Sequence, residues 1–99
     1  MEINKAQSGD TCTLTLIGRL DTVTSPKLQE TLTETIASAA AVELDFAQVD
    51  YVSSAGLRVL LLGEKNAKAS GKAMSLRNVS AEVMEVFEIT GFSGILKIV

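Results

Sequence analysis

Two adjacent serine hydroxyls at the start of a predicted helix are the groups of this chain best placed for chemistry. Ser53 and Ser54 follow an alternating run, Val42 to Phe46, and precede a leucine-rich run that begins at Leu57. A helix start has free backbone amides and the positive end of the helix dipole, so it favours an anion. A phosphate there adds about −1.5 to −2 charge without melting the helix. The serine pair therefore predicts either a simple N-cap or a site of phosphorylation.

The residues that most catalytic mechanisms require are missing from this sequence. No histidine is present, which excludes His-based triads, His metal sites and imidazole acid–base catalysis. The glycines match neither G-x-G-x-x-G nor a P-loop, because Gly71-Lys72-Ala73 lacks the rest of that pattern. The single Cys12 lies in an alternating Thr/Leu run without a basic neighbour, which is typical of a packed side chain. We therefore expect no enzymatic activity, no cofactor and no bound metal.

Length and charge set the class of protein. The 99 residues, of which 46% are hydrophobic and 21% charged, suit one domain spanning residues 1–99. Nine Lys and Arg against 12 Asp and Glu give a net charge of −3, which argues against direct binding of nucleic acid. No signal-peptide pattern and no long apolar run is present, and a lone cysteine suits a reducing compartment. We expect a cytoplasmic protein without membrane insertion.

Hydrophobic periodicity and capping residues predict the elements that position the serines. Two runs with alternating side-chain character, Glu2–Gln7 and Thr11–Ile17, flank the turn signal Ser8-Gly9-Asp10 and predict an antiparallel hairpin. Three helices are expected to begin at capping serines and to end among small residues: Ser25 (with Pro26 in the first turn) to Ala39–Ala41, Ser53 or Ser54 to Gly71, and Ser80 to Gly91. Short alternating runs predict further strands at 42–46, 74–78 and 95–99.

Each predicted helix has one apolar stripe that is expected to face the core. The stripes are Leu28, Leu32 and Ile36; then Leu57, Leu60, Leu61 and Ala67; then Val83, Val86, Phe87 and Thr90. On the second helix Arg58 and Lys65 lie seven residues apart near one face, either as solvated charges or as contacts for an acidic partner. Lys68 and Lys72 are interpreted as solubilising charges.

The element order ββαβαβαβ defines an α/β fold with a small mixed sheet packed against three helices. Strand–helix–strand units of this length favour parallel pairing, with the hairpin strand at the sheet edge. Ligand and partner sites in such sheets gather beyond the carboxyl ends of the parallel strands. Two predicted loops lie at that end, Gly18–Ser25 and Gln48–Ala55. We expect the functional surface there.

The chain resembles the STAS domain family, named for sulphate transporters and anti-sigma factor antagonists. The resemblance covers the whole chain and is strongest for the bacterial antagonists that consist of this domain alone. It rests on the element order and on three segments: Gly18-Arg19-Leu20-Asp21, Ser53-Ser54-Ala55-Gly56-Leu57, and the closing residues 89–98. The resemblance implies a STAS-like fold.

The family motif, Asp-Ser-(Ser/Thr)-Gly-Leu, implies that Ser54 is the residue that a partner kinase phosphorylates. Ser53 stands where the family has its aspartate, and Ala55 stands where the family has a second hydroxyl residue. Ser53 is therefore the alternative acceptor. Asp21 matches a family aspartate beside the site, which either shapes the surface that the partner reads or bonds local backbone amides.

The resemblance implies an anti-sigma factor antagonist that acts by partner switching. It would bind an anti-sigma factor serine kinase, be released by phosphorylation at Ser54, and be reset by a phosphatase. The residues expected to contact the partner are Asp21, Thr22, Ser53, Ser54, Ala55, Gly56, Leu57 and Arg58. The alternative is a STAS adaptor subunit of an ABC-type lipid transport complex. A nucleotide-binding module is disfavoured without a P-loop, and the oligomeric state is left open.

Overall fold

The chain folds into a mixed four-stranded sheet with strand order β1-β2-β3-β4, in a computed structural model that describes residues 1–99. The elements in chain order are β1 (Glu2–Ser8), β2 (Thr11–Leu20), α1 (Ser25–Ser38), β3 (Ala41–Val52), α2 (Ser54–Ala69), β4 (Ala73–Arg77), α3 (Ala81–Thr90) and a short 3₁₀ turn, η1 (Phe92–Gly94). Strand β1 is antiparallel to β2, and the pairs β2–β3 and β3–β4 are parallel. The predicted mixed sheet, with the hairpin strand β1 at its edge, is confirmed.

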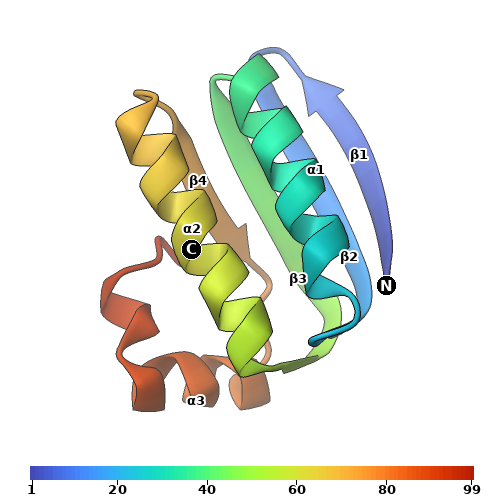
Figure 1. Cartoon of the computed structure of the whole chain (residues 1–99), viewed down its shortest axis with the longest axis vertical. Helices are drawn as coiled ribbons and strands as arrows, with labels where there is room; N and C mark the ends of the chain where they lie inside the picture. The colour runs from blue at the N-terminus through green and yellow to red at the C-terminus, as the bar shows by residue number, and fades with distance from the viewer.

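Helices α1 and α2 lie side by side on one face of the sheet, and α3 lies across one end (Figure 1). Alternate strand residues such as Leu14, Leu44 and Leu76 are fully buried in the core. Phe46 of β3 meets Phe87 of α3 edge to face, with ring centroids 6.3 Å apart. The alternation of apolar residues therefore decides which face of the sheet the helices cover.

The other residues of the strands form a polar face with a small ion-pair network. Arg77 of β4 reaches across to Glu43 at 3.0 Å and to Asp45 at 3.6 Å. Asp45 also accepts hydrogen bonds from the Ala47 amide and from Asn78. These charges link β3 to β4 on the face that α1 and α2 leave uncovered.

Strand β3 is longer than predicted and reaches Val52, six residues beyond Phe46. Two irregularities in the pairing with β2 allow both strands to continue, between Thr15 and Ile17 and between Gly18 and Leu20. A strict two-residue alternation misses such a strand because a bulge breaks the periodicity. The loops at the carboxyl ends are correspondingly short, namely residues 21–24 and Ser53.

The predicted final strand at 95–99 is wrong. Residues 92–94 form η1, and only one parallel bridge joins Ile98 to Leu76. The Leu76 amide donates to the Lys97 carbonyl at 2.8 Å, and the Val99 amide donates to the Leu76 carbonyl at 2.9 Å. The segment nevertheless anchors itself through Leu96, which is buried.

The stripes of the helices are confirmed in part. All three residues of the α1 stripe are buried, as are Leu57, Leu60 and Ala67 of α2 and Val83 and Phe87 of α3. Leu61 and Val86 are only half-buried, and Thr90 is exposed with its hydroxyl bonded to the Val86 carbonyl. Val59 is buried instead, because α1 packs beside it.

Four predicted helix ends, one each of α1 and α2 and both of α3, are confirmed or need a small correction. Thr24 and not Ser25 occupies the N-cap position of α1, although its side chain caps no helix amide. Ser25 is the first residue of the helix, and its hydroxyl donates to the carbonyl of Asp21 in the preceding loop at 2.5 Å. Ser80 caps α3 by accepting from the Val83 amide, and Gly91 ends that helix with φ +80°. Gly71 follows α2 with φ +69°, a left-handed conformation that favours glycine.

Lys72 caps a helix and is not merely a solubilising charge. Its Nζ donates to the carbonyls of Ile36 and Ala39 at the end of α1, both at 2.8 Å. A cation at a helix C-terminus satisfies free carbonyls and complements the helix dipole. The first residues after α2 therefore secure the end of α1.

Candidate functional site

The parallel strands β2 and β3 end side by side, which brings the two predicted site segments together. Leu20 and Val52 are paired residues, and the Ser53 amide donates to the Leu20 carbonyl at 2.8 Å. The next residues are Asp21 on one segment and Ser54 on the other. Residues more than thirty positions apart in the sequence thus begin one surface at the carboxyl end of the sheet.

Gly56 allows α2 to start against the end of β2. A Cβ atom at this position would lie 2.7 Å from Leu20 Cγ and 3.0 Å from the Leu20 carbonyl oxygen. Both distances are too short for an undisturbed side chain, so the close approach requires glycine. Gly56 and Leu57 are buried. These two predicted contact residues therefore position the helix from within the core.

The two serines have different environments. Ser53 is the N-cap of α2, is half-buried, and accepts a hydrogen bond from the Gly56 amide on its Oγ at 3.3 Å. Ser54 is the first residue of the helix and is exposed, and its hydroxyl makes no hydrogen bond within the protein. The capping role that the sequence left open between the two belongs to Ser53.

Asp21 organises the loop between β2 and α1. Its Oδ1 accepts the amides of Val23 at 3.0 Å and Thr24 at 3.1 Å. The hydrogen bond from the Thr24 amide, with further bonds from the Thr24 hydroxyl and the Val23 amide, lowers the pKa of Asp21 below its ordinary value of 3.8. The expectation that Asp21 bonds local backbone amides is confirmed. The turn presents Val23 to solvent with 86% of its surface exposed.

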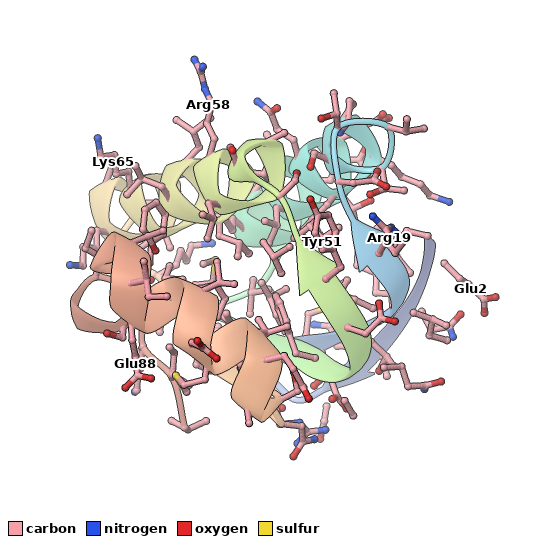
Figure 2. The ribbon with its side chains drawn as sticks, turned by 90° about the horizontal axis from the view of Figure 1, so that it is seen from below. Glu2, Arg19, Tyr51, Arg58, Lys65 and Glu88 are labelled. Carbon is pink, nitrogen blue, oxygen red and sulfur yellow. The ribbon has the colours of Figure 1, made fainter.

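Arg19 and Tyr51 flank this loop on neighbouring strands (Figure 2). The Arg19 guanidinium lies 4.3 Å from the centroid of the Tyr51 ring, and its Nε lies 3.7 Å from Asp21 Oδ2. Tyr51 remains 43% exposed, so the ring offers an apolar face beside the loop. The sequence patterns did not indicate Val23, Arg19 or Tyr51 as residues of this surface. A predicted strand that continued to Val52 would have indicated Tyr51 as exposed, because Tyr51 alternates with the buried Val52.

Three predicted contact residues line one hollow. Thr22, Ala55 and Arg58 surround a cavity of about 170 Å³ between the starts of α1 and α2. Its other lining residues are Ser25, Pro26, Gln29, Val59 and Leu62. We call the exposed residues at this end of the molecule, Thr22, Val23, Tyr51, Ser54 and Arg58, the Ser54 surface. The surface combines the hydroxyls of Thr22, Tyr51 and Ser54 with the apolar side chain of Val23, the aromatic ring of Tyr51 and the cation of Arg58.

Clusters of three or more His, Cys, Asp or Glu residues able to hold a metal ion are not found in the fold. None of the helices has the length and apolar character needed to cross a membrane.

Comparison with known proteins identifies the class to which this fold and surface belong. A family model described as the Mlab STAS domain matches residues 3–98, and the chain belongs to the STAS domain family. The chain is similar to the anti-sigma-B factor antagonist of Bacillus subtilis (strain 168). The two are 26% identical over 98 residues, which cover 99% of this chain and 90% of that protein. The family expected from the sequence is confirmed.

Solved structures confirm the STAS fold. The anti-sigma factor antagonist SpoIIAA in its unphosphorylated form superposes with a TM-score of 0.83 and 18% identity, over 99% of this chain and 88% of that chain. SpoIIAA is also known in a phosphorylated form. A sulfate transporter family protein from Wolinella succinogenes gives a TM-score of 0.82 and 15% identity, over 95% of this chain and 80% of that chain. Identities this low show the fold alone, and the fold is shared by proteins of different function.

Proposed function

We propose that this protein is an anti-sigma factor antagonist that acts by partner switching. The unphosphorylated protein binds an anti-sigma factor serine kinase in the cytoplasm and thereby releases a sigma factor for transcription. The kinase phosphorylates Ser54, which ends the complex, and a phosphatase restores the binding form. The protein is on this proposal a substrate of its partner and not an enzyme.

The exposed, unbonded hydroxyl of Ser54 at the start of α2 is the observation that carries the proposal. A kinase can reach this oxygen without opening the fold. The hydroxyl of Ser53 already accepts from the Gly56 amide, so phosphorylation there would disturb the cap. The similarity to a named anti-sigma-B factor antagonist supports the same reading.

A phosphate on Ser54 changes binding far more than folding. The first amides of α2 and the helix dipole stabilise an anion at this position. The same anion stands within the Ser54 surface, with Arg58 one turn further along α2. An unpaired charge in a buried contact costs about 2–5 kcal/mol, which is enough to release a partner.

The test is peptide mass spectrometry on the protein recovered from its own cells, with S54A and S53A as a matched pair. We expect one phosphate on the peptide that contains Ser54, absent from S54A and present in S53A. S53A loses the N-cap and is expected to be about 1 kcal/mol less stable, whereas S54A keeps wild-type stability. A phosphate that persists in S54A and disappears in S53A would transfer the role to Ser53.

Binding by S54A and by a further variant, S54E, tests the switch itself. S54A should hold the partner permanently, and S54E should bind more weakly with little change in the free energy of unfolding. If S54E unfolds the domain, the proposed role of Ser54 at an exposed helix start fails.

A STAS adaptor of a lipid transport complex is the second candidate. It is favoured by the description of the matched family model, the Mlab STAS domain. Absence of phosphate under all growth conditions, together with co-purification of a transport ATPase, would establish the adaptor and overturn the antagonist.

A further inference from the structure

A groove runs between α1 and α2 from the Ser54 surface toward the opposite end of the helices. Two adjoining hollows form it, of about 170 Å³ and about 210 Å³, and they share Gln29, Val59 and Leu62. The first hollow opens at Arg58, one helical turn from Ser54. The second continues past Gly63. The groove is therefore continuous with the proposed site of phosphorylation.

The floor of the groove is apolar, and its margin on α2 is basic. Leu32 and Ile36 are buried at the base, whereas Leu62 is 41% exposed at the rim. Arg58 and Lys65 project into solvent from the same side of α2 (Figure 2). Neither forms an ion pair, since the ion pairs of the protein involve only Arg19 and Arg77. Two free cations thus flank an exposed leucine.

The margin on α1 has a different character. Gln29 and Thr33 line the groove with neutral polar groups. The acids Glu30 and Glu34 lie further out, beside a third and more open hollow that shares Pro26, Gln29 and Thr33 with the groove. A segment lying in the groove therefore meets positive charge on its α2 side and no carboxylate among the lining residues.

We propose that this groove binds an acidic amphipathic segment of the partner protein. An apolar side chain of that segment packs on Leu62 and Val59, and its carboxylates pair with Arg58 and Lys65. This inference rests on the proposed partner-switching function and identifies the chemistry of the partner's contact element. Charge complementarity and continuity with the Ser54 surface favour such a segment over a neutral or basic one.

The groove also explains why the charge on Ser54 acts on binding. Ser54 and Arg58 are four residues apart on α2, a spacing that lets their side chains meet on one helix face. A phosphate on Ser54 therefore competes with the partner's carboxylate for Arg58. Phosphorylation adds a negative charge and at the same time withdraws a positive one from the partner.

The test measures the dissociation constant of the purified kinase that phosphorylates Ser54, in the absence of ATP, by isothermal titration calorimetry. L62D, R58E and K65E are each expected to weaken binding by about tenfold or more. The binding of wild-type protein should also weaken with added salt, and less so for K65E. Matched controls at exposed positions away from the groove, I89D on α3 and K5E on β1, should bind within about twofold of wild type.

Each other outcome overturns a defined statement. Wild-type binding by L62D would show that the groove is not occupied. Weaker binding by L62D together with unchanged binding by R58E and K65E would show that the segment is not acidic. Binding that weakens equally in I89D and in L62D would show that the contact is not confined to the groove. If wild-type protein binds no kinase, the proposed function itself fails, whereas the three preceding outcomes leave it standing.

Discussion

At the scale of single residues, Gly56 shows how one missing side chain positions the functional surface. The helix that carries Ser54 begins in contact with Leu20, which precedes the Asp21 loop. Any Cβ at position 56 separates the two segments or distorts both. The packing of this glycine in the core thus determines how closely the Asp21 loop and the start of α2 lie together on the surface.

We predict that Gly56→Ala destabilises the protein by about 1–2 kcal/mol, because the strain of overpacking exceeds the gain in helix propensity. Urea unfolding measures the change. Gly63→Ala is the matched control on the same helix. Its Cβ would approach only the ends of Leu32 and Met74, at 3.1 Å, and these flexible ends can move. A larger loss in Gly63→Ala than in Gly56→Ala would contradict this account.

The Asp21 carboxylate makes stability depend on pH in the acid range. The hydrogen bond from the Thr24 amide lowers the pKa of Asp21 in the folded state below 3.8, so the ionised form is favoured in the fold. Its contribution is present above that value and is lost as the pH falls through the lower folded pKa. Between about pH 5 and about pH 2 the free energy of unfolding should fall more steeply for wild type than for Asp21→Asn.

Asp21→Asn keeps an oxygen acceptor for the loop amides and removes only the charge, so the difference isolates the titration. Asp45→Asn provides a comparison, since the Ala47 amide lowers the pKa of Asp45 in the same direction. Parallel pH profiles for wild type and Asp21→Asn would refute the assigned role of the carboxylate.

At the scale of the elements, the helix ends are connected to one another. The turn after α2 holds Gly71 in a left-handed conformation, and Lys72 then reaches the last carbonyls of α1. The two helices that line the groove are therefore joined at the end opposite the Ser54 surface. Their spacing depends on this cap as well as on the apolar stripe between them.

We predict that Lys72→Met destabilises the protein by about 1–2 kcal/mol, because two charge-assisted hydrogen bonds at a helix end are lost. Lys65→Met, at an exposed position without an ion pair, should change stability by less than about 0.5 kcal/mol. Thermal or urea unfolding of the two variants distinguishes a structural lysine from a surface one. If Lys72→Met and Lys65→Met were equally stable, Lys72 would be only a solubilising charge.

At the scale of the whole molecule, the sheet is completed by a segment that is not a strand. Residues beyond η1 contact β4 through one bridge at Leu76, and Leu96 enters the core. The last residues therefore belong to the folded unit even though their backbone is irregular.

We predict that Leu96→Ala costs about 2–4 kcal/mol, as expected for a buried leucine. Ile95→Ala, at a position 45% exposed, should cost less than about 1 kcal/mol. The two unfolding curves would coincide if the segment did not contribute to the core.

The sequence by itself predicted the elements whose signals are local. The predictions of helix ends at Ser80, Gly71 and Gly91 are correct, because each depends on neighbours within one or two turns. The same holds for the α1 stripe with its four-residue spacing. The family motif, which is also local in the sequence, indicated Ser54.

The tertiary structure alone decided which distant residues meet. The proximity of the Asp21 loop to Ser53 depends on strand pairing, and the contact of Lys72 with Ile36 spans 36 positions. The continuation of β3 to Val52 required two irregularities in its pairing with β2, and the single bridge at Leu76 replaced an expected strand. Such features result from long-range packing, which overrides local periodicity and leaves no signal within a short window of sequence.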